Sequence, residues 1–378
     1  MANKGQMLTY EGCNFFRQRV LLATLSGRSL KVHKIRQFDD KVGVSPFEVD
    51  LMKLVEKLSK GATIMFSEDT TSLTYHPGLL DGGRVQHDCH TSRGIGYYLE
   101  LVIYLAPFMK KPLDITLTGV TNNQQDISVD SIQFATLPVL KLFLGSDEGL
   151  SLKINKRGCL PEAGGEINFT CPTKPKLRSL QLNLNPSSLL VKRIRGVAWT
   201  CRVSPADCKR MTDGAKEVLS GCMLSDVFIT SDHRKGPSAG KSPGFGITLV
   251  AETKTGVCYC SEAMSNAKGS SSGPSLPEDI GKEAAIKLLL EISKGGCVDS
   301  NNQCLASTLM VLNDKDVSKL LVGPLTDYTI HHLRHLRDFF GVTFKIDPRE
   351  VKDVGRGEDK LLLTCVGVGY KNLSRPIL

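Results

Sequence analysis

Residues 157–167 read Arg157-Gly158-Cys159-Leu160-Pro161-Glu162-Ala163-Gly164-Gly165-Glu166-Ile167. They lie between two alternating apolar segments, Leu150–Ile154 and Ile167–Cys171, which predict a strand–loop–strand unit. An arginine, a rigid proline and paired glycines in such a loop let the backbone approach an anion closely and present its N–H groups. A tight structural turn is the simpler alternative, because a glycine pair alone marks many such turns.

The composition is that of a globular protein with a full core. The chain has 378 residues, of which 41% are hydrophobic and 23% charged, and its length suggests about two domains. A net charge of +9 favours polyanionic partners. The basic residues form small groups rather than one tail, and each group alone is typical of a solvated strand face or loop: Lys31–Arg36, Lys174–Arg178 and Lys192–Arg195.

Twelve cysteines raise the question of disulfides or a metal site. The sequence contains no C-x-x-C pair, only Cys258-x-Cys260 and separated single cysteines, so no zinc site is expected. The opening residues Met1–Gly5 lead into polar sequence without the apolar core of a signal peptide, which predicts reduced thiols in an intracellular protein. The longest apolar run, Leu101–Met109, is shorter than the roughly 20 residues of a membrane helix, so no membrane contact is expected.

The chain contains an internal repeat. Two stretches follow the same order of a helix, a short strand, a second helix and further strands, with helices predicted at Phe15–Leu25 and Pro46–Leu58, then at Ile95–Leu105 and Val129–Phe143. Landmark residues keep offsets of 83, 84 and 82 residues between the copies: Leu30 and Leu113, Gly61 and Gly145, Gly82 and Gly164.

A third copy lies near the C-terminus, where a predicted helix from Thr326 ends at Gly341 and leads into the strand Val342–Ile346. Gly341 follows Gly61 by 280 residues, whereas two repeats would give roughly 166, so an extra segment must separate the second and third copies. We therefore predict an α/β (α+β) fold of three repeated helix/strand units with a small inserted α/β domain. The predicted body is 1–186 plus 278–378, with units at about 1–84, 85–186 and 278–378, and the inserted domain is 187–277.

These features resemble the RNA 3'-terminal phosphate cyclase family over essentially the whole chain. Residues 157–166 are similar to its R-G-x-x-P-x-G-G-G-E signature, with Ala163 at the first signature glycine. Other matching stretches are most similar to the cyclase-like branch of the family, which acts in ribosome biogenesis: Pro77–Gly83, Arg93–Glu100, Leu105–Phe108, Gly119–Asn122, Gly240–Gly246 and Gly295–Ser300. The resemblance implies three units like the C-terminal domain of translation initiation factor three, with a small inserted domain.

The family chemistry is an ATP-dependent conversion of an RNA 3'-phosphate to a 2',3'-cyclic phosphate through an adenylylated histidine. The resemblance places the family's S-x-H-x-x-T-N stretch at Gly323–Thr329, with Leu325 at the histidine position, and leucine cannot form the phosphoramidate. The family's E-G-G-G-Q-x-L-R motif reads Glu11-Gly12-Cys13-Asn14-Phe15-Phe16-Arg17, so Cys13 and Asn14 replace glycines that bring backbone to phosphates. We therefore expect no cyclase activity, no catalytic residue and no cofactor.

Three histidines, His331, His332 and His335, lie on the predicted C-terminal helix. Its apolar stripe leaves a predicted polar face of His332, Arg334, His335 and Arg337. This face is either simply solvated or a docking surface for an acidic peptide or a phosphate. Acidic pairs were weighed as metal ligands, but loops and helix caps explain them, so no two-metal site is predicted: Asp39 with Asp40, Asp126 with Asp130, and Asp314 with Asp316.

The leading hypothesis is a non-catalytic binding module. The resemblance implies a nucleolar assembly factor of the small ribosomal subunit, recruited by a large ribosome-biogenesis GTPase and acting on 18S pre-rRNA. The residues predicted to hold anions or RNA are Arg157, Gly158, Gly164 and Gly165, with Lys192, Arg193 and Arg195 on the inserted domain, and those predicted to dock the partner are Arg334, His335 and Arg337. The alternatives are an RNA-processing enzyme, either an endonuclease or a residual cyclase, and a free-standing RNA chaperone.

Overall fold

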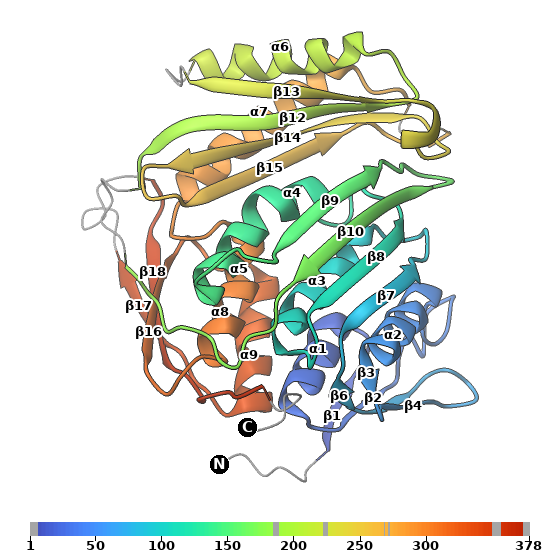
Figure 1. Cartoon of the computed structure of the whole chain (residues 1–378), viewed down its shortest axis with the longest axis vertical. Coiled ribbons are helices and arrows are strands. Elements are labelled where there is room, and N and C mark those ends of the chain that lie inside the picture. Colours follow the sequence, from blue (N-terminus) through green and yellow to red (C-terminus); the bar gives the residue numbers. More distant parts are fainter. Residues whose placement is uncertain are drawn as a thin grey trace.

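The computed structural model describes residues 7–183, 189–221, 226–267, 269–270, 273–349 and 357–372. Three four-stranded sheets surround a shared helical core, and a fourth sheet stands on one end of this body (Figure 1). The three body sheets have the same construction, in which one parallel pair is followed by two antiparallel neighbours. The fold is the mixed α/β architecture of repeated units predicted from the sequence.

The first sheet has the order β1-β2-β5-β4, with β1 (Leu8–Glu11), β2 (Leu30–His33), β5 (Leu73–His76) and β4 (Thr63–Phe66). Its helices are α1 (Phe16–Ser26) and α2 (Pro46–Leu58). A two-stranded ribbon of β3 (Ser59–Lys60) and β6 (Leu79–Leu80) leads into the next unit. The side chain of Glu48 and the hydroxyl of Ser45 form a capping box that starts α2 after Ser45.

The second sheet has the order β7-β8-β10-β9, with β7 (Gly83–Asp88), β8 (Leu113–Gly119), β10 (Gly165–Cys171) and β9 (Ser151–Lys156). Its helices are α3 (Ile95–Leu105), α4 (Val129–Ser131) and α5 (Leu137–Leu144), with a π-helical turn joining the last two. Strands β8 and β10 bury every second residue, because only one face of the sheet meets the helices.

The third sheet has the order β11-β16-β18-β17, with β11 (Gln181–Leu182), β16 (Val317–Val322), β18 (Lys360–Val366) and β17 (Lys345–Arg349). Its helices are α8 (Gln303–Val311) and α9 (Asp327–Phe340). Gly145 and Gly341, two of the repeat landmarks, each end a helix with a φ near +70°, a conformation that favours glycine. This shared helix stop explains why these glycines recur at corresponding places.

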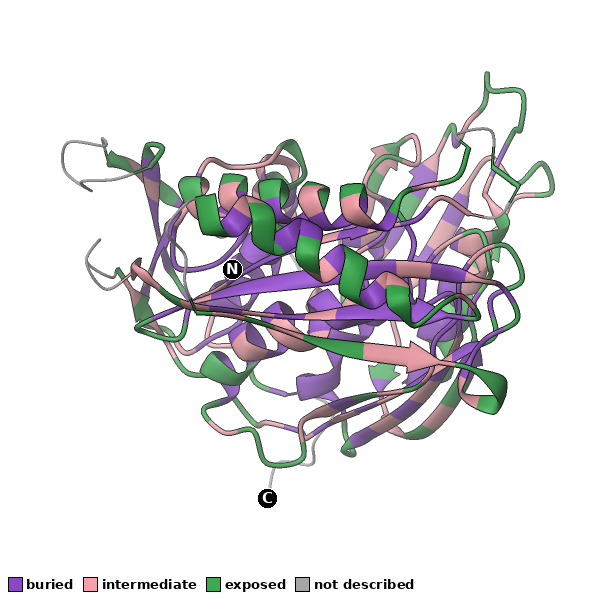
Figure 2. Cartoon of the chain, turned by 90° about the horizontal axis from the view of Figure 1, so that it is seen from above, coloured by how far each residue is buried: buried purple, intermediate pink, exposed green. Residues whose placement is uncertain are grey.

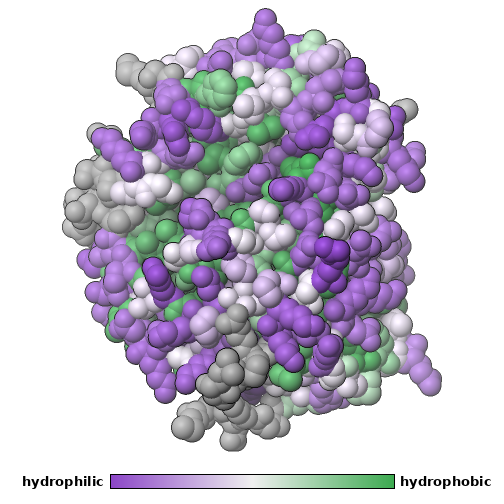
Figure 3. Space-filling model, viewed as in Figure 1, coloured by the Kyte–Doolittle hydropathy of each residue, from purple (hydrophilic) through white to green (hydrophobic). Residues whose placement is uncertain are grey.

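The fourth sheet has the order β13-β12-β14-β15, with β13 (Val227–Arg234), β12 (Val191–Cys201), β14 (Gly244–Thr253) and β15 (Cys258–Met264). Helices α6 (Ala206–Gly221) and α7 (Pro277–Lys294) cover one face of it and bury a separate hydrophobic core. Viewed from this end, the outer faces of the helices are exposed while the strands beneath are largely buried (Figure 2). Hydrophilic side chains dominate the face of the molecule drawn in Figure 3.

Two predicted boundaries need correction. Strand β11 pairs with β16, so the third unit begins before the inserted segment, which interrupts this unit instead of following the second one. Helix α7, assigned to the body by the boundary at 278, packs its buried residues Ile280, Ala284 and Leu288 into the core of the fourth sheet. The inserted part therefore runs from β12 through α7. A two-residue strand is too short for a sequence pattern to reveal, and an amphipathic helix does not show which sheet it will cover.

Candidate functional site

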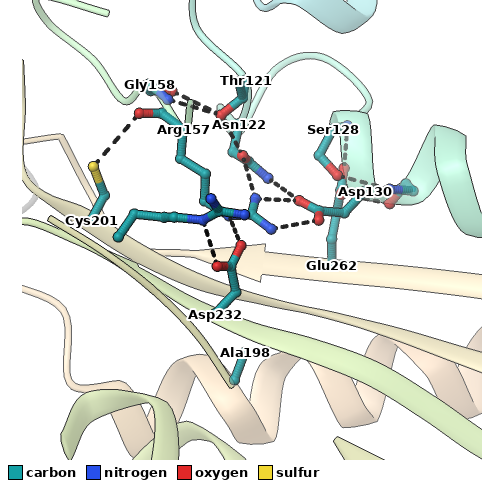
Figure 4. Close-up of polar contacts among 12 residues, drawn as sticks. Thr121, Asn122, Ser128, Asp130, Arg157, Gly158, Ala198, Cys201, Asp232 and Glu262 are labelled. Carbon is teal, nitrogen blue, oxygen red and sulfur yellow. Dashed lines mark hydrogen bonds and ion pairs between the residues drawn. The ribbon is translucent and has the colours of Figure 1, made fainter. Parts of the chain in front are cut away.

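The signature loop 157–165 lies at the seam between the body and the fourth sheet. Its arginine is buried, with only 2% of Arg157 exposed. The guanidinium donates from Nη1 and Nη2 to the two carboxylate oxygens of Asp130, each at 2.7 Å, and from Nε to Asp232 at 2.7 Å. Asp130 belongs to the body and Asp232 to β13, so the side chain joins the two parts (Figure 4).

The electrostatics of this seam follow from its burial. Burial opposes the charge on Arg157, but the carboxylates of Asp130 and Asp232 outweigh it and hold the pKa of Arg157 above its ordinary value. Burial likewise opposes the charge on Asp130, and Arg157 still holds the pKa of Asp130 below its ordinary value. The guanidinium also lies 5.3 Å from the ring centre of Trp199. The guanidinium of Arg157 therefore directs its hydrogen bonds to side chains of the protein itself.

The prediction that Arg157 contacts a bound anion is therefore wrong, because two carboxylates already occupy the guanidinium. Gly158 and Gly165 are packed backbone against backbone, and a Cβ on Gly158 would lie 2.2 Å from the amide nitrogen of Gly165. Gly164 is exposed with a φ of +85°, beside Gly240 and Lys241. The glycines serve close packing of the seam, which is the structural alternative that the sequence left open.

The three cations predicted on the inserted part lie on β12. Arg193 pairs with Glu252 at 2.6 Å, and Arg195 pairs with Asp226 at 2.9 Å, so a local carboxylate compensates each charge. The side chain of Lys192 is exposed and makes no ion pair within the described part of the chain. Of these three, Lys192 alone retains an uncompensated charge.

The helix α9 differs from its predicted pattern. His332 and His335 are buried, with exposed fractions of 1% and 5%, whereas Arg334 and Arg337 are exposed. The prediction of a polar face containing both histidines is wrong because α9 is covered on two sides. His332 Nε2 lies 2.6 Å from the Thr308 hydroxyl on α8, and His335 Nδ1 lies 3.0 Å from Gln18 Oε1 on α1.

Burial sets the protonation state of both histidines. Removal from water lowers the pKa of His332 to about 3, and burial together with the Arg19 charge lowers the pKa of His335 to about 4. Both rings are therefore neutral near pH 7. Neither histidine is available as a cation for partner docking, and His335 leaves the set of predicted contact residues.

Leu325 lies between β16 and α9 and packs against the central hydrophobic core. The neighbouring carbonyl of Pro324 accepts a hydrogen bond of 3.0 Å from Gln303 Nε2. In the altered motif near the N-terminus, Phe15 has a φ of +59°, and its ring stacks on His331 with the ring centres 4.3 Å apart. An aromatic pair therefore occupies the position where the family resemblance implies a phosphate-binding loop.

Sequence reasoning missed the cluster that surrounds Arg17. This arginine pairs with Glu100 at 2.5 Å, donates to the carbonyl of Tyr97 at 3.0 Å and lies near the hydroxyl of Tyr328 at 3.3 Å. The cavity among these residues has a volume of about 20 Å³, enough for a water molecule and far too small for a nucleotide. The residues come from three different units, so no local pattern in the sequence could indicate their contact.

A second feature missed from the sequence is a cavity of about 330 Å³ between the body and the inserted part. Loop residues Asn123 and Gln124 line one side, and Thr248 and Glu262 of the sheet line the other. Glu262 accepts hydrogen bonds from the Ser128 N–H at 3.0 Å and the Ser131 hydroxyl at 2.6 Å, so it caps helix α4 from the other part of the molecule. The buried hydroxyl of Thr248 finds no hydrogen-bond partner among the residues that the structure describes.

Within the described residues, no group of three or more His, Cys, Asp or Glu side chains is arranged to hold a metal ion. No helix in the same part of the chain combines the length and apolar character that crossing a membrane requires.

Comparison with known proteins shows the family. The family model for RNA 3'-terminal phosphate cyclase matches residues 8–346, and the chain belongs to this family. It is 49% identical to the human RNA 3'-terminal phosphate cyclase-like protein, with both chains covered completely. It is 47% identical to the probable RNA 3'-terminal phosphate cyclase-like protein of Drosophila melanogaster, over 100% of this chain and 99% of the relative. It is also 41% identical to the rRNA processing protein rcl1 of Schizosaccharomyces pombe, over 99% of each chain.

Proposed function

We propose that this protein is a non-catalytic assembly factor of the small ribosomal subunit, acting in 18S pre-rRNA processing in the nucleolus. The observation that carries the proposal is the full-length similarity to a relative named as an rRNA processing protein. The family resemblance also implies Leu325 at the position of the cyclase histidine. In this proposal the fold binds pre-rRNA and a large ribosome-biogenesis GTPase, without chemistry of its own.

The geometry around Leu325 supports the absence of cyclase chemistry. A leucine side chain offers no nucleophile, and the cavity beside Arg17 and Glu100 has no room for ATP. In the altered glycine motif, Cys13 and Asn14 replace glycines that would bring backbone N–H groups to phosphates, and the ring of the adjacent Phe15 stacks on His331. In this proposal the protein lacks the nucleophile that adenylylation requires.

For partner binding, we assign Arg334 and Arg337, which remain exposed on α9. Arg337 has one neighbouring carboxylate, Asp338, at 3.4 Å, and this exposed contact is weak. Two guanidinium groups one turn apart on a helix suit an acidic segment of the GTPase, since arginine binds carboxylates through two parallel hydrogen bonds.

The first experiment tests the catalytic question with purified full-length protein. The protein is incubated with radiolabelled ATP and an RNA 3'-phosphate, beside a true cyclase as the positive control. We expect no covalent adenylate and no cyclic end. A labelled adenylate on this chain would show that another side chain has taken over the nucleophile's role, and the proposal would give way to a residual cyclase.

The second experiment addresses partner binding. The variant Arg334→Glu/Arg337→Glu should lose co-purification with the GTPase, whereas Arg84→Glu, an exposed arginine on β7, should retain it. Equal retention by both variants would place the partner elsewhere on the surface.

Nucleolar localisation is tested by imaging the tagged full-length protein, and exclusion from the nucleolus would contradict the proposal.

A further inference from the structure

The C-terminal segment 367–372 crosses the surface of the body and connects loops that are far apart in the sequence. Asn372 donates its backbone N–H to Pro175 at 3.1 Å and its side-chain amide to the carbonyl of Met109 at 3.0 Å. The Gly369 N–H donates to the carbonyl of Asn313 at 2.9 Å. These contacts place Lys371 beside the loop that carries Lys110 and Lys111.

A fourth lysine reaches the same segment. Gly369 has a φ of +68°, and a Cβ added there would lie 2.8 Å from Cγ of Lys315. The aliphatic part of Lys315 therefore crosses directly over Gly369, two residues before Lys371. Four lysines from three separate segments follow one short stretch of backbone. We refer to Lys110, Lys111, Lys315 and Lys371 as the lysine patch.

The lysine patch carries four positive charges. All four side chains are exposed, and none makes an ion pair within the described part of the chain. Three carboxylates in the neighbouring loops have other partners: Asp81 pairs with Lys60 at 2.8 Å, Asp314 pairs with Lys176 at 3.0 Å, and Asp316 accepts from the Ser179 hydroxyl at 2.9 Å. The hydrogen bond from Lys60, with the charges of Lys111 and Lys110 nearby, lowers the pKa of Asp81.

We propose that the lysine patch binds the phosphates of an RNA strand, without reading its bases. Lysine ammonium groups are flexible point charges that suit phosphate contacts, and such contacts position a nucleic acid without specifying its sequence. The inference rests on the proposed function, because the relative named for rRNA processing is the reason to prefer RNA over an acidic peptide.

The test measures the affinity of the full-length protein for a fluorescently labelled single-stranded RNA at several salt concentrations. Each neutralised phosphate contributes about 0.7 to the slope of log K against log salt concentration for a single strand. The variant Lys110→Gln/Lys111→Gln/Lys371→Gln should therefore bind more weakly, with a slope shallower by about 2. Because all three positions are exposed, the variant should fold like the wild type, which its circular dichroism and melting temperature will show.

The matched control replaces three other exposed lysines by glutamine: Lys53 on α2, and Lys209 and Lys216 on α6. Helix α6 lies at the end of the molecule opposite the C-terminus (Figure 1). The control variant removes the same formal charge as the patch variant. If RNA binding depends on the position of the lysines and not on net charge, the control variant should keep the wild-type salt slope.

The outcomes separate this inference from the function on which it rests. Wild-type binding with equal slopes in the patch and control variants would overturn the lysine patch and leave the proposed function standing. Absence of RNA binding by the wild-type protein would overturn both. Unchanged RNA binding, with weaker capture of a poly-glutamate peptide by the patch variant, would assign the lysine patch to a protein partner and overturn the RNA inference.

Discussion

Arg157 and Asp130 form a buried pair in which two nitrogens of the guanidinium meet two oxygens of the carboxylate, each at 2.7 Å. Both side chains are only 2% exposed. Removing one partner from such a pair leaves a buried charge without compensation, which is much more costly than losing an exposed contact. This pair gives the signature loop a structural role at the seam.

Arg157→Ala should lower the free energy of unfolding by about 3–5 kcal/mol, because the buried carboxylate of Asp130 loses its cation, whereas Asp232 keeps its pair with Arg234. Urea unfolding followed by circular dichroism measures the change. The control is Arg84→Ala, which removes an exposed pair with Asp114 at 3.4 Å and should cost less than about 1 kcal/mol. Similar losses in the two variants would contradict the role of the seam.

Gly158→Ala should destabilise the protein by about 3 kcal/mol, since the new methyl group meets backbone atoms of Gly165 and Gly119 that cannot rotate away. Gly221→Ala at the end of α6 is the comparison, because a Cβ there meets nothing within 4 Å. Thermal melting of both variants provides the measurement. A stable Gly158→Ala protein would mean that the loop can widen.

The buried histidines predict a dependence on pH. His332 is neutral in the folded protein, with a pKa of about 3, whereas the unfolded chain binds a proton below its ordinary pKa of 6.5. The stability that His332 contributes is thus present above pH 6.5 and is lost as the pH falls toward 3. Because pH 5 lies 1.5 units below the ordinary pKa of 6.5 and each unit corresponds to about 1.4 kcal/mol, the free energy of unfolding should fall by about 2 kcal/mol between pH 7 and pH 5.

This effect is isolated by comparing wild type with His332→Gln in urea unfolding at pH 7 and pH 5. The difference between the two proteins should shrink by about 2 kcal/mol at the lower pH, since other titrating groups cancel. His90→Gln, at an exposed position, is the matched control. If the difference in free energy of unfolding from the wild type is the same at pH 7 and pH 5 for both variants, burial of His332 does not govern its protonation.

Leu325→His should not create an adenylylated protein. The variant restores a ring nitrogen at the position implied by the family resemblance, but Cys13 and Asn14 still replace the motif glycines, and the cavity beside Arg17 measures only about 20 Å³. Transfer of label from radioactive ATP measures the reaction. Labelling of the variant but not of the wild type would show that the missing histidine is the sole defect.

The repeat was predictable because the units share a sheet order and two of them end corresponding helices at a glycine. Gly145 and Gly341 are visible in the sequence, and their left-handed conformation ends α5 and α9. The place of β11 was not predictable, since two residues form a strand there only because β16 offers an edge from more than a hundred residues away. Local pattern specifies elements, and long-range pairing decides their neighbours.

The candidate site was less predictable than the fold for a physical reason. The sequence shows that Arg157 is charged, but it does not show that Asp130 and Asp232 converge on it from two parts of the molecule. The helical period of α9 places His335 outside the apolar stripe of the helix. In the structure, α1 packs against the side of α9 that carries His335, so this histidine is buried as well. Charge and amphipathicity are local properties, whereas exposure depends on every element that packs nearby.

The position of the Arg157 seam has a mechanical consequence. The chain crosses between the body and the inserted part at the two ends of that part, before β12 and after α7. The seam adds a non-covalent attachment near Cys201, at the far end of β12. That strand has 11 residues and spans roughly 35 Å. The two chain crossings lie near one end of β12 and by themselves would let the inserted part rotate about them as a hinge. The distant attachment at the Arg157 seam blocks this rotation. A ligand that bridges both parts therefore meets a preset surface and loses little entropy in aligning it.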